Sequence, residues 1–175
     1  MPERFIEFYP YWYYHIYNRS LTKESIFLND SDYKKFLDKK DILLEENLKD
    51  FKIQIPAYSI MPNHFHFIIT YTNEEEENII TKFMHRLQTS YSMYFNKKYW
   101  RKWQLFEWRF KANPITNDKY LEWCFTYVTF NPVKHWIIND IEKYPYTSYH
   151  ELKEDEKNYY KWINKNIGYS EELEF

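Results

Sequence analysis

Glycine and cysteine are almost absent from this sequence of 175 residues, which contains only Gly168 and Cys124. A single cysteine cannot close an internal disulfide, and no Cys/His zinc pattern accompanies it, so we expect Cys124 to lie in the core. No apolar run approaches the roughly 20 residues of a membrane helix. Residues 1–14 carry acids and aromatics where a signal peptide needs a basic start and an apolar stretch. These absences predict a soluble protein that stays in the cytoplasm.

Aromatic residues are abundant instead, with 19 Tyr, 14 Phe and 7 Trp. In such a chain a tyrosine carries information only through its spacing to other groups. Hydrophobic residues make up 44% of the sequence and charged residues 29%, which is typical of a globular chain rather than a disordered one. We expect one domain over residues 1–150, with an acidic C-terminal tail over residues 151–175 packed on the same domain.

Positive charge gathers in the middle of the chain, although the formal net charge of the whole is −2. Residues 81–135 contain ten Lys or Arg and three acids, a local charge of plus seven. The basic residues that could contact the phosphates of a nucleic acid are Arg86, Lys97, Lys98, Arg101, Lys102, Arg109 and Lys111. Aromatic residues lie between them, namely Tyr91, Tyr94, Tyr99, Trp100, Trp103 and Trp108. The mixture fits a groove that tracks phosphates while rings stack on unpaired bases, but it also fits a solvated basic face over core aromatics.

Hydrophobic periodicity predicts an α+β fold. We expect strands at residues 12–18, 53–60, 64–71 and 105–114. We expect helices from a Ser31 cap to about residue 48, from the acidic run 74–77 to about residue 95, and from Asp118 toward Pro132. Residues 144–149 are expected to form an ordered turn. The order βαββαβ followed by a helix is the ferredoxin-like arrangement, an antiparallel sheet with two helices on one face.

The third strand carries two histidines with one residue between them. Side chains at i and i+2 of a strand point to the same face, so His64 and His66 present two imidazoles side by side while Phe65 faces the opposite layer. Two neighbouring imidazoles can chelate one divalent ion. On their own, however, such histidines are most often surface residues beside a turn.

The last predicted helix supplies a second pair, because Tyr127 and Asn131 are four residues apart and would share one helix face. The Asn131 amide oxygen would be a third metal ligand, and the Tyr127 phenol would lie beside the metal. Three protein ligands leave positions open for water and a phosphate oxygen, as a catalytic ion requires. A packed aromatic on an amphipathic helix is the alternative interpretation of Tyr127.

Four motifs carry a resemblance to a known family. They are Tyr58-Ser-Ile-Met-Pro-Asn-His-Phe-His-Phe-Ile-Ile69, Phe106-Glu-Trp-Arg-Phe-Lys111, Tyr127-Val-Thr-Phe-Asn-Pro-Val133 and Tyr144-Pro-Tyr-Thr-Ser-Tyr149. In this order and approximate spacing they resemble the REP-associated tyrosine transposases, part of the wider HUH class of single-tyrosine transposases. Residues 14–19 and 83–96 are also similar, so the resemblance covers about residues 14–150.

The resemblance implies a metal-dependent enzyme that cleaves and rejoins single-stranded or hairpin DNA of palindromic repeats. By it, His64 and His66 bind Mg²⁺ or Mn²⁺, Asn131 is the third ligand, and Tyr127 is the nucleophile that forms a 5′-phosphotyrosine bond. A free phenol has a pKa of about 10, so a nearby cation is needed to stabilise its phenolate. His15 on the first strand is either a DNA-contacting group, a residue that supports the site, or simply a structural histidine.

Two other functions remain open at this point. A domesticated relative could hold hairpin DNA or structured RNA without cutting it, and a replication-initiation or conjugative nuclease of the HUH class would use the same motifs, usually in a larger chain. The resemblance favours a bacterial protein that acts at the nucleoid. It also favours a monomer over a dimer.

Overall fold

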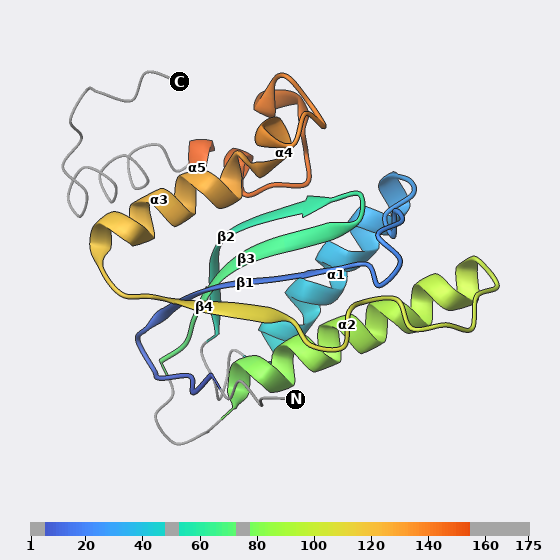
Figure 1. Cartoon of the computed structure of the whole chain (residues 1–175), viewed down its shortest axis with the longest axis horizontal. Coiled ribbons are helices and arrows are strands. Elements are labelled where there is room, and N and C mark those ends of the chain that lie inside the picture. The colour runs from blue at the N-terminus through green and yellow to red at the C-terminus, as the bar shows by residue number, and fades with distance from the viewer. Residues whose placement is uncertain (1–5, 48–52, 73–77, 155–175) are drawn as a thin grey trace.

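The computed structural model of the chain describes residues 6–47, 53–72 and 78–154 (Figure 1). Its elements in chain order are β1 (Tyr13–Arg19), α1 (Asp30–Asn47), β2 (Gln54–Met61), β3 (His64–Thr70), α2 (Ile79–Lys98), β4 (Lys111–Ile115), α3 (Asp118–Thr129), α4 (Asn131–Lys134), the short 3-10 helix η1 (Ile141–Lys143) and α5 (Tyr149–Glu154). The predicted βαββαβ order followed by a helix is therefore confirmed. None of the helices in these ranges is long and apolar enough to cross a membrane.

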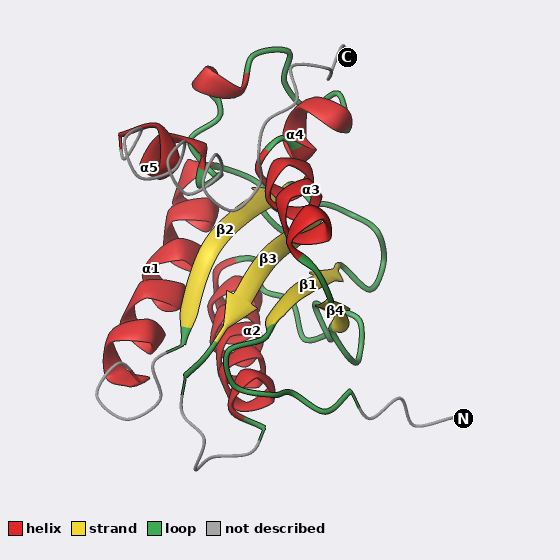
Figure 2. Ribbon diagram, turned by 90° about the vertical axis from the view of Figure 1, so that its left-hand side faces the viewer, coloured by secondary structure: helices red, strands yellow, loops and turns green. Residues whose placement is uncertain are grey.

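The four strands form one antiparallel sheet in the order β2-β3-β1-β4. Helices α1 and α2 pack together on one face of this sheet, while α3 crosses the opposite face against β2, β3 and β4 (Figures 1 and 2). The connection between β2 and β3 is the tight turn expected at Met61-Pro62-Asn63, and the pairing of β2 shifts register between Gln54 and Ala57, around Pro56. The sheet is thus the middle of three layers.

Strand alternation divides the hydrophobic residues between the two faces. The larger core lies under α1 and α2 and contains Tyr14, Ile16, Phe65 and Phe67 from the two central strands. The smaller core lies under α3 and contains Ala57, Ile68, Ile115, Leu121, Cys124, Phe125 and Val128. Cys124 is fully buried there, as predicted. This smaller core covers only part of its face, and polar residues occupy the rest.

The fourth strand is shorter than predicted. It spans Lys111–Ile115, whereas residues 105–110 form an irregular segment that meets the end of β1 and the residues after it through an isolated bridge between Ser20 and Phe106. Two backbone hydrogen bonds, Glu107 N–H to Arg19 O and Leu21 N–H to Leu105 O, and the buried side chains of Leu105 and Phe106 hold this segment. The predicted extension of the strand back to residue 105 is wrong because apolar residues that insert into a core need not pair as a ladder.

The start of α1 also differs from the prediction, which placed the cap at Ser31. Helix α1 begins at Asp30, and the backbone N–H groups of Leu28 and Asn29 donate to the carboxylate of Asp32 at 2.9 and 3.3 Å. Asp32, which is fully buried, therefore accepts hydrogen bonds from the backbone just before the helix, although it lies within the first turn of α1. The acidic run 74–77 that was expected to open the second helix lies outside the described residues.

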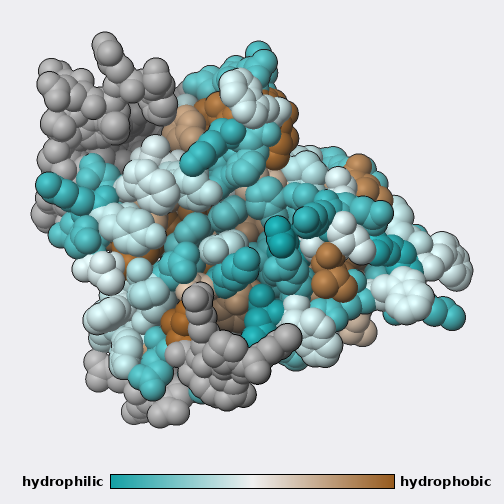
Figure 3. Space-filling view, viewed as in Figure 1, coloured by the Kyte–Doolittle hydropathy of each residue, from teal (hydrophilic) through white to brown (hydrophobic). Residues whose placement is uncertain are grey.

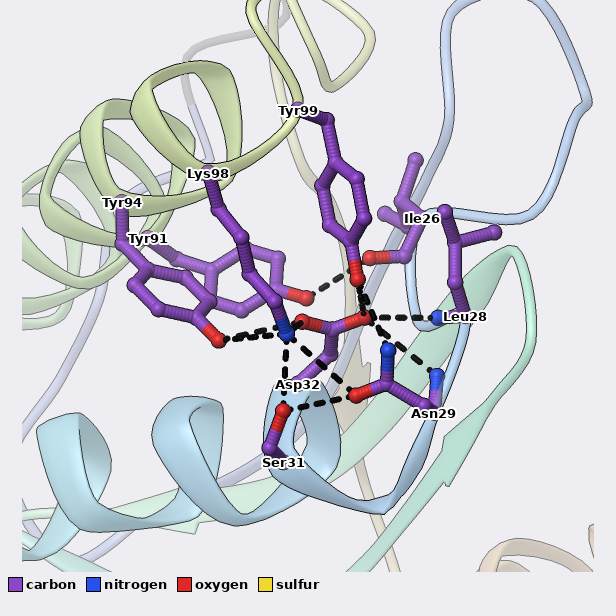
Figure 4. Close-up of polar contacts among 9 residues, drawn as sticks. All are labelled: Ile26, Leu28, Asn29, Ser31, Asp32, Tyr91, Tyr94, Lys98 and Tyr99. Carbon is purple, nitrogen blue, oxygen red and sulfur yellow. Dashed lines mark hydrogen bonds and ion pairs between the residues drawn. The ribbon is translucent and has the colours of Figure 1, made fainter.

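Asp32 also joins α1 to the end of α2 (Figure 4). Lys98 Nζ donates to its Oδ1 at 2.6 Å, the Tyr94 hydroxyl donates to Oδ1 at 3.1 Å, and the Tyr99 hydroxyl donates to Oδ2 at 2.7 Å. Burial by itself raises the pKa of this carboxyl, but the hydrogen bonds from Lys98, Tyr99, Leu28 and Tyr94 outweigh burial and hold the pKa below its usual value. The network fixes the point where the chain leaves α2.

Residues 144–149 form an ordered segment against β2, as expected. Its residues bond to the strand through Ile60 N–H, which donates to Tyr146 O at 2.8 Å, and Ser148 N–H, which donates to Tyr58 O at 3.0 Å. The chain then enters α5, which ends at Glu154. The expected packing of the acidic tail falls mostly on residues 155–175, outside the described residues.

Candidate active site

Two imidazoles lie side by side on the face of the sheet that α3 covers. His64 and His66 occupy alternate positions of β3, and their ring centres are 5.3 Å apart with the planes at 78°. Imidazoles that share one ion at about 2.1 Å per bond have ring centres roughly 5 Å apart. Because residues i and i+2 of a strand point to the same face, His64 and His66 have a spacing that suits chelation of one metal ion.

A third histidine supports His66 from the neighbouring strand. His15 of β1 pairs in register with Ile68, which sets its ring diagonally across from His66. His15 Nε2 lies 2.8 Å from His66 Nδ1, and the two rings stack with centres 5.1 Å apart. His64 has a comparable support, because its Nδ1 lies 2.6 Å from Oδ1 of Asn63. With both Nδ1 atoms engaged, Nε2 of each ring is the nitrogen left to bind a ligand.

The three rings are neutral at neutral pH. Burial lowers the pKa of His15 to about 4 and that of His64 to about 4, with the neighbouring His135 and Arg19 adding to the effect at His64. Burial also holds the pKa of His66 well below its ordinary value, and the repulsion that protonated His15, His64 and His135 would exert on a protonated His66 lowers this pKa further. A neutral imidazole offers a lone pair, so protons do not compete with a metal for these rings at pH 7.

Tyr127 reaches the same place from α3. Its ring centre is 5.9 Å from that of His66 and 5.8 Å from that of His15, edge-on to both. Trp123, one turn earlier on α3, stacks on the Tyr127 ring at 4.8 Å and 17°. The structure thus brings the predicted nucleophile on α3 to the predicted metal pair on β3, although these two elements are far apart in the sequence.

Asn131 does not continue the helix of Tyr127, contrary to the prediction. Helix α3 ends at Thr129, Phe130 forms the junction, and Asn131 begins the separate short helix α4. The break follows from Pro132, which has no N–H to extend the ladder of α3. Asn131 is completely buried, and neither Oδ1 nor Nδ2 has a hydrogen-bond partner among the described residues.

A buried amide without a partner is unfavourable by about 1–3 kcal/mol, so a ligand or a water molecule is expected to engage Asn131. No group of three or more His, Cys, Asp or Glu side chains within residues 6–47, 53–72 and 78–154 is arranged to hold a metal. A divalent ion on His64 and His66 would therefore need a donor of another kind. The unpartnered amide oxygen of Asn131 and a phosphate oxygen of the substrate are such donors. Together with the two histidines they make a ligand set that a divalent ion accepts.

The sequence did not indicate two residues of the site, His135 and Lys134. The turn of α4 brings the ring of His135 to 5.4 Å from the ring of His64. It also sets Lys134 Nζ 4.5 Å from the centre of the Tyr127 ring. Nothing in the spacing of the sequence indicates these contacts, because they depend on the direction in which the chain leaves α3. The only available signal was the adjacency of both residues to the Asn131-Pro132-Val133 motif.

The predicted DNA-binding residues divide into two groups. Lys98 is bound to the buried carboxylate of Asp32, so we assign it to the fold rather than to DNA. Three aromatics of the predicted stacking surface are likewise structural: Tyr91 is fully buried and donates to Ile26 O at 2.6 Å, while Tyr94 and Tyr99 donate to Asp32. His15 is 6% exposed and contacts His66, which favours a supporting role over contact with DNA.

The other basic residues keep side chains at the surface. Arg86 forms an exposed ion pair with Glu46, Arg101 lies over the ring of Phe95, and Lys111 Nζ lies 5.8 Å from the centre of the Tyr17 ring, which stacks on His66. Lys97 is exposed at the end of α2. Contact of these residues with DNA stays a prediction, and Lys111 is the one that lies beside the histidine pair.

Lys102 and Arg109 line a groove of about 760 Å³ between α2 and the segment that returns to β4. Trp103 and Trp108 also line it, with 76% and 87% of their surfaces exposed, and Trp100 nearby is 94% exposed. Tryptophan is usually largely buried, so rings left open to this extent are available for stacking on a ligand. Elsewhere, the face shown in Figure 3 is mostly hydrophilic, with hydrophobic residues in small separate patches.

Comparison with known proteins agrees with this arrangement. Residues 9–131 match the family model described as IS200-like transposase. A curated protein of Haemophilus influenzae, described as a REP-associated tyrosine transposase, is 24% identical over 113 residues, which are 61% of this chain and 64% of that relative. The chain thus spans less than two thirds of that relative's length.

A solved structure of a REP-associated tyrosine transposase bound to a REP hairpin is similar with a TM-score of 0.71 and 18% identity. The similarity covers 88% of this chain and 86% of the other. It supports the predicted α+β fold.

Proposed function

The chain belongs to the IS200-like transposase family, and we propose that it cleaves and rejoins single-stranded or hairpin DNA with Tyr127 as the nucleophile. The observation that carries the proposal is the meeting of Tyr127 with His66 and His15, at 5.9 and 5.8 Å between ring centres. If Tyr127 were only an aromatic residue packed in the core, it would not need polar neighbours such as His15 and His66. The arrangement is what nucleophilic attack on a phosphodiester beside a cation requires.

In the proposed reaction, Tyr127 Oη attacks the phosphorus of one phosphodiester. The P–Oη bond forms as the P–O3′ bond breaks, the phenol proton passes to solvent, and the 3′ oxygen takes a proton from water and leaves as a hydroxyl. The strand is then held as a 5′-phosphotyrosine. Attack by a 3′ hydroxyl on the same phosphorus reverses these bond changes, frees Tyr127 and joins the strands. Each step exchanges one phosphodiester for another, so no external energy source is required.

His64 and His66 would hold a divalent ion, Mg²⁺ or Mn²⁺, with Asn131 as the third ligand. Bound there, the ion would polarise the scissile phosphate and neutralise charge that develops during attack. The protein contributes the orientation of its donors. His15 and Asn63 fix the two rings through their Nδ1 atoms, and burial keeps the rings neutral.

The proposed partner is hairpin DNA from palindromic repeats. The family membership and the complex of the similar transposase with a REP hairpin support this substrate. The open tryptophans and basic residues of the groove suit unpaired bases and phosphates. We further propose that the protein acts as a monomer.

The experiment uses the purified chain, Mn²⁺ and a hairpin oligonucleotide taken from the DNA that flanks its gene. A covalent protein–DNA adduct on a denaturing gel is expected for the native chain and for Tyr120→Phe, a control two turns earlier on α3. Tyr127→Phe should give no adduct. An adduct that persists in Tyr127→Phe refutes the assignment of the nucleophile. Tight hairpin binding by the native chain with no adduct under any metal would instead favour a protein that binds DNA without cutting it.

A further inference from the structure

Lys134 stands over the proposed nucleophile although it is seven residues away in sequence. Its Nζ is 4.5 Å from the centre of the Tyr127 ring. The contact exists because α3 stops at Thr129 and the chain turns through Phe130 into α4. In a continuous helix, a residue seven positions further on would lie roughly 10 Å along the axis from Tyr127. The break therefore brings a cation back to the phenol.

The positive charge of Lys134 has no carboxylate partner in the part of the chain that the structure describes. Other basic residues show the contrast, since Lys98 is bound to Asp32, Arg86 to Glu46 and Arg19 to Glu107. The side chain of Lys134 is also exposed. A surface lysine that rests on the Tyr127 ring, with no acid to pair with among the described residues, is available to bind an anion.

We propose that Lys134 is a catalytic residue whose ammonium binds a non-bridging oxygen of the phosphate that Tyr127 attacks. The inference rests on the proposed function. The attacked phosphorus must lie about 3 Å from Tyr127 Oη, so its oxygens fall within the reach of a lysine held over the same ring. Attack concentrates negative charge on these oxygens, and a cation placed in advance stabilises that charge more than it stabilises the bound ground state.

The geometry also separates Lys134 from the cations of the groove. Lys102 and Arg109 line a cavity whose walls include none of Tyr127, His64 or His66. Their contacts with phosphate would hold the DNA equally before and during the reaction. Removal of such a residue weakens binding, whereas removal of Lys134 should slow the chemical step.

The test compares Lys134→Gln and Lys134→Arg with the native chain and with Lys119→Gln, an exposed lysine near the start of α3. The rate of adduct formation is measured in a single turnover at saturating hairpin DNA, and the hairpin Kd is measured separately in a Tyr127→Phe background. Lys134→Gln should slow adduct formation about 30- to 100-fold while Kd changes less than about 3-fold. Lys134→Arg keeps the charge and should recover most of the rate. Lys119→Gln should react at the native rate.

Thermal unfolding of each variant tests whether the fold is intact, and a native midpoint is expected because the side chain is exposed. A Lys134→Gln rate within about 2-fold of the native rate overturns the inference while leaving the proposed function in place. So does a loss that appears entirely in Kd, since Lys134 would then be an ordinary DNA-binding cation. A native chain that forms no adduct overturns both proposals.

Discussion

Replacement of His15 by phenylalanine removes one hydrogen bond from the proposed metal site and little else. His15 Nε2 and His66 Nδ1 are 2.8 Å apart in a buried contact, and the His15 ring stacks on that of His66. If His66 binds a metal through Nε2, its proton must be on Nδ1 and must be donated to His15. Phenylalanine keeps the flat ring but cannot accept that proton.

The magnitude follows from the burial of the contact. An Nδ1–H left without a partner in a buried site is unfavourable by about 1–3 kcal/mol. Metal binding through Nε2 requires this tautomer, so the penalty falls on the metal complex. A value of about 2 kcal/mol corresponds to a loss of roughly 30-fold in metal affinity, within the range of about 10- to 100-fold seen when partners of ligating histidines are removed.

The assay is a titration of the apo protein with Mn²⁺, followed by calorimetry or by the electron paramagnetic resonance signal of free Mn²⁺. His15→Gln restores an acceptor and should bind more tightly than His15→Phe. His85→Phe changes an exposed histidine of α2 that lines the groove and should bind Mn²⁺ like the native chain. Native affinity in His15→Phe would refute the reasoning that His15 orients His66.

Three further predictions follow from other parts of the structure. Asp32→Ala should lower the free energy of unfolding by about 3 kcal/mol, because it leaves several donors of α1 and α2 unpaired; an unchanged urea midpoint would contradict this. In a chelator the native chain should lose stability as the pH falls from about 6.5 toward 4, because burial lowers the folded-state pKa of His64 and of His15 to about 4 and the unfolded state therefore binds more protons in that window; thermal unfolding across this range measures it, and His64→Gln should reduce the loss without abolishing it. Trp103→Ala combined with Trp108→Ala should weaken hairpin binding at least 10-fold, if each ring contributes about 1–3 kcal/mol of stacking, whereas unchanged affinity in a fluorescence anisotropy titration would exclude the groove from the DNA interface.

The sheet with two helices on one face and the histidine pair could be predicted because both rest on short-range rules, whereas the packing of α3 on the opposite face was not predicted. A strand period of two sets His64 and His66 on one face regardless of the rest of the molecule. The βαββαβ order leaves few ways to pair four strands, so the sheet followed from it. The contact between His15 and His66 required the register of β1 against β3, which no pattern within either strand specifies.

The surroundings of Tyr127 were harder to predict, for a specific reason. Pro132 indicates that a helix ends nearby, but it does not indicate the direction of the next turn. That direction decides that Asn131 is buried, that Lys134 lies over the phenol and that His135 meets His64. The same limit applies to the aromatics of residues 91–108. Their type does not show which of them face the core, and it was the tertiary structure that buried Tyr91, left Tyr94 and Tyr99 half-buried, and exposed the tryptophans.

The proposed mechanism depends on one covalent bond, between Tyr127 and a 5′ phosphate of DNA. The most direct test is to trap the product of the native chain with a hairpin oligonucleotide labelled at its 3′ end, digest it with trypsin and nuclease, and sequence the modified peptide by mass spectrometry. We expect a nucleotide attached through its 5′ phosphate to Tyr127, together with release of a DNA fragment that ends in a 3′ hydroxyl. Attachment to another residue, attachment through a 3′ phosphate, or cleavage with no peptide adduct would contradict it.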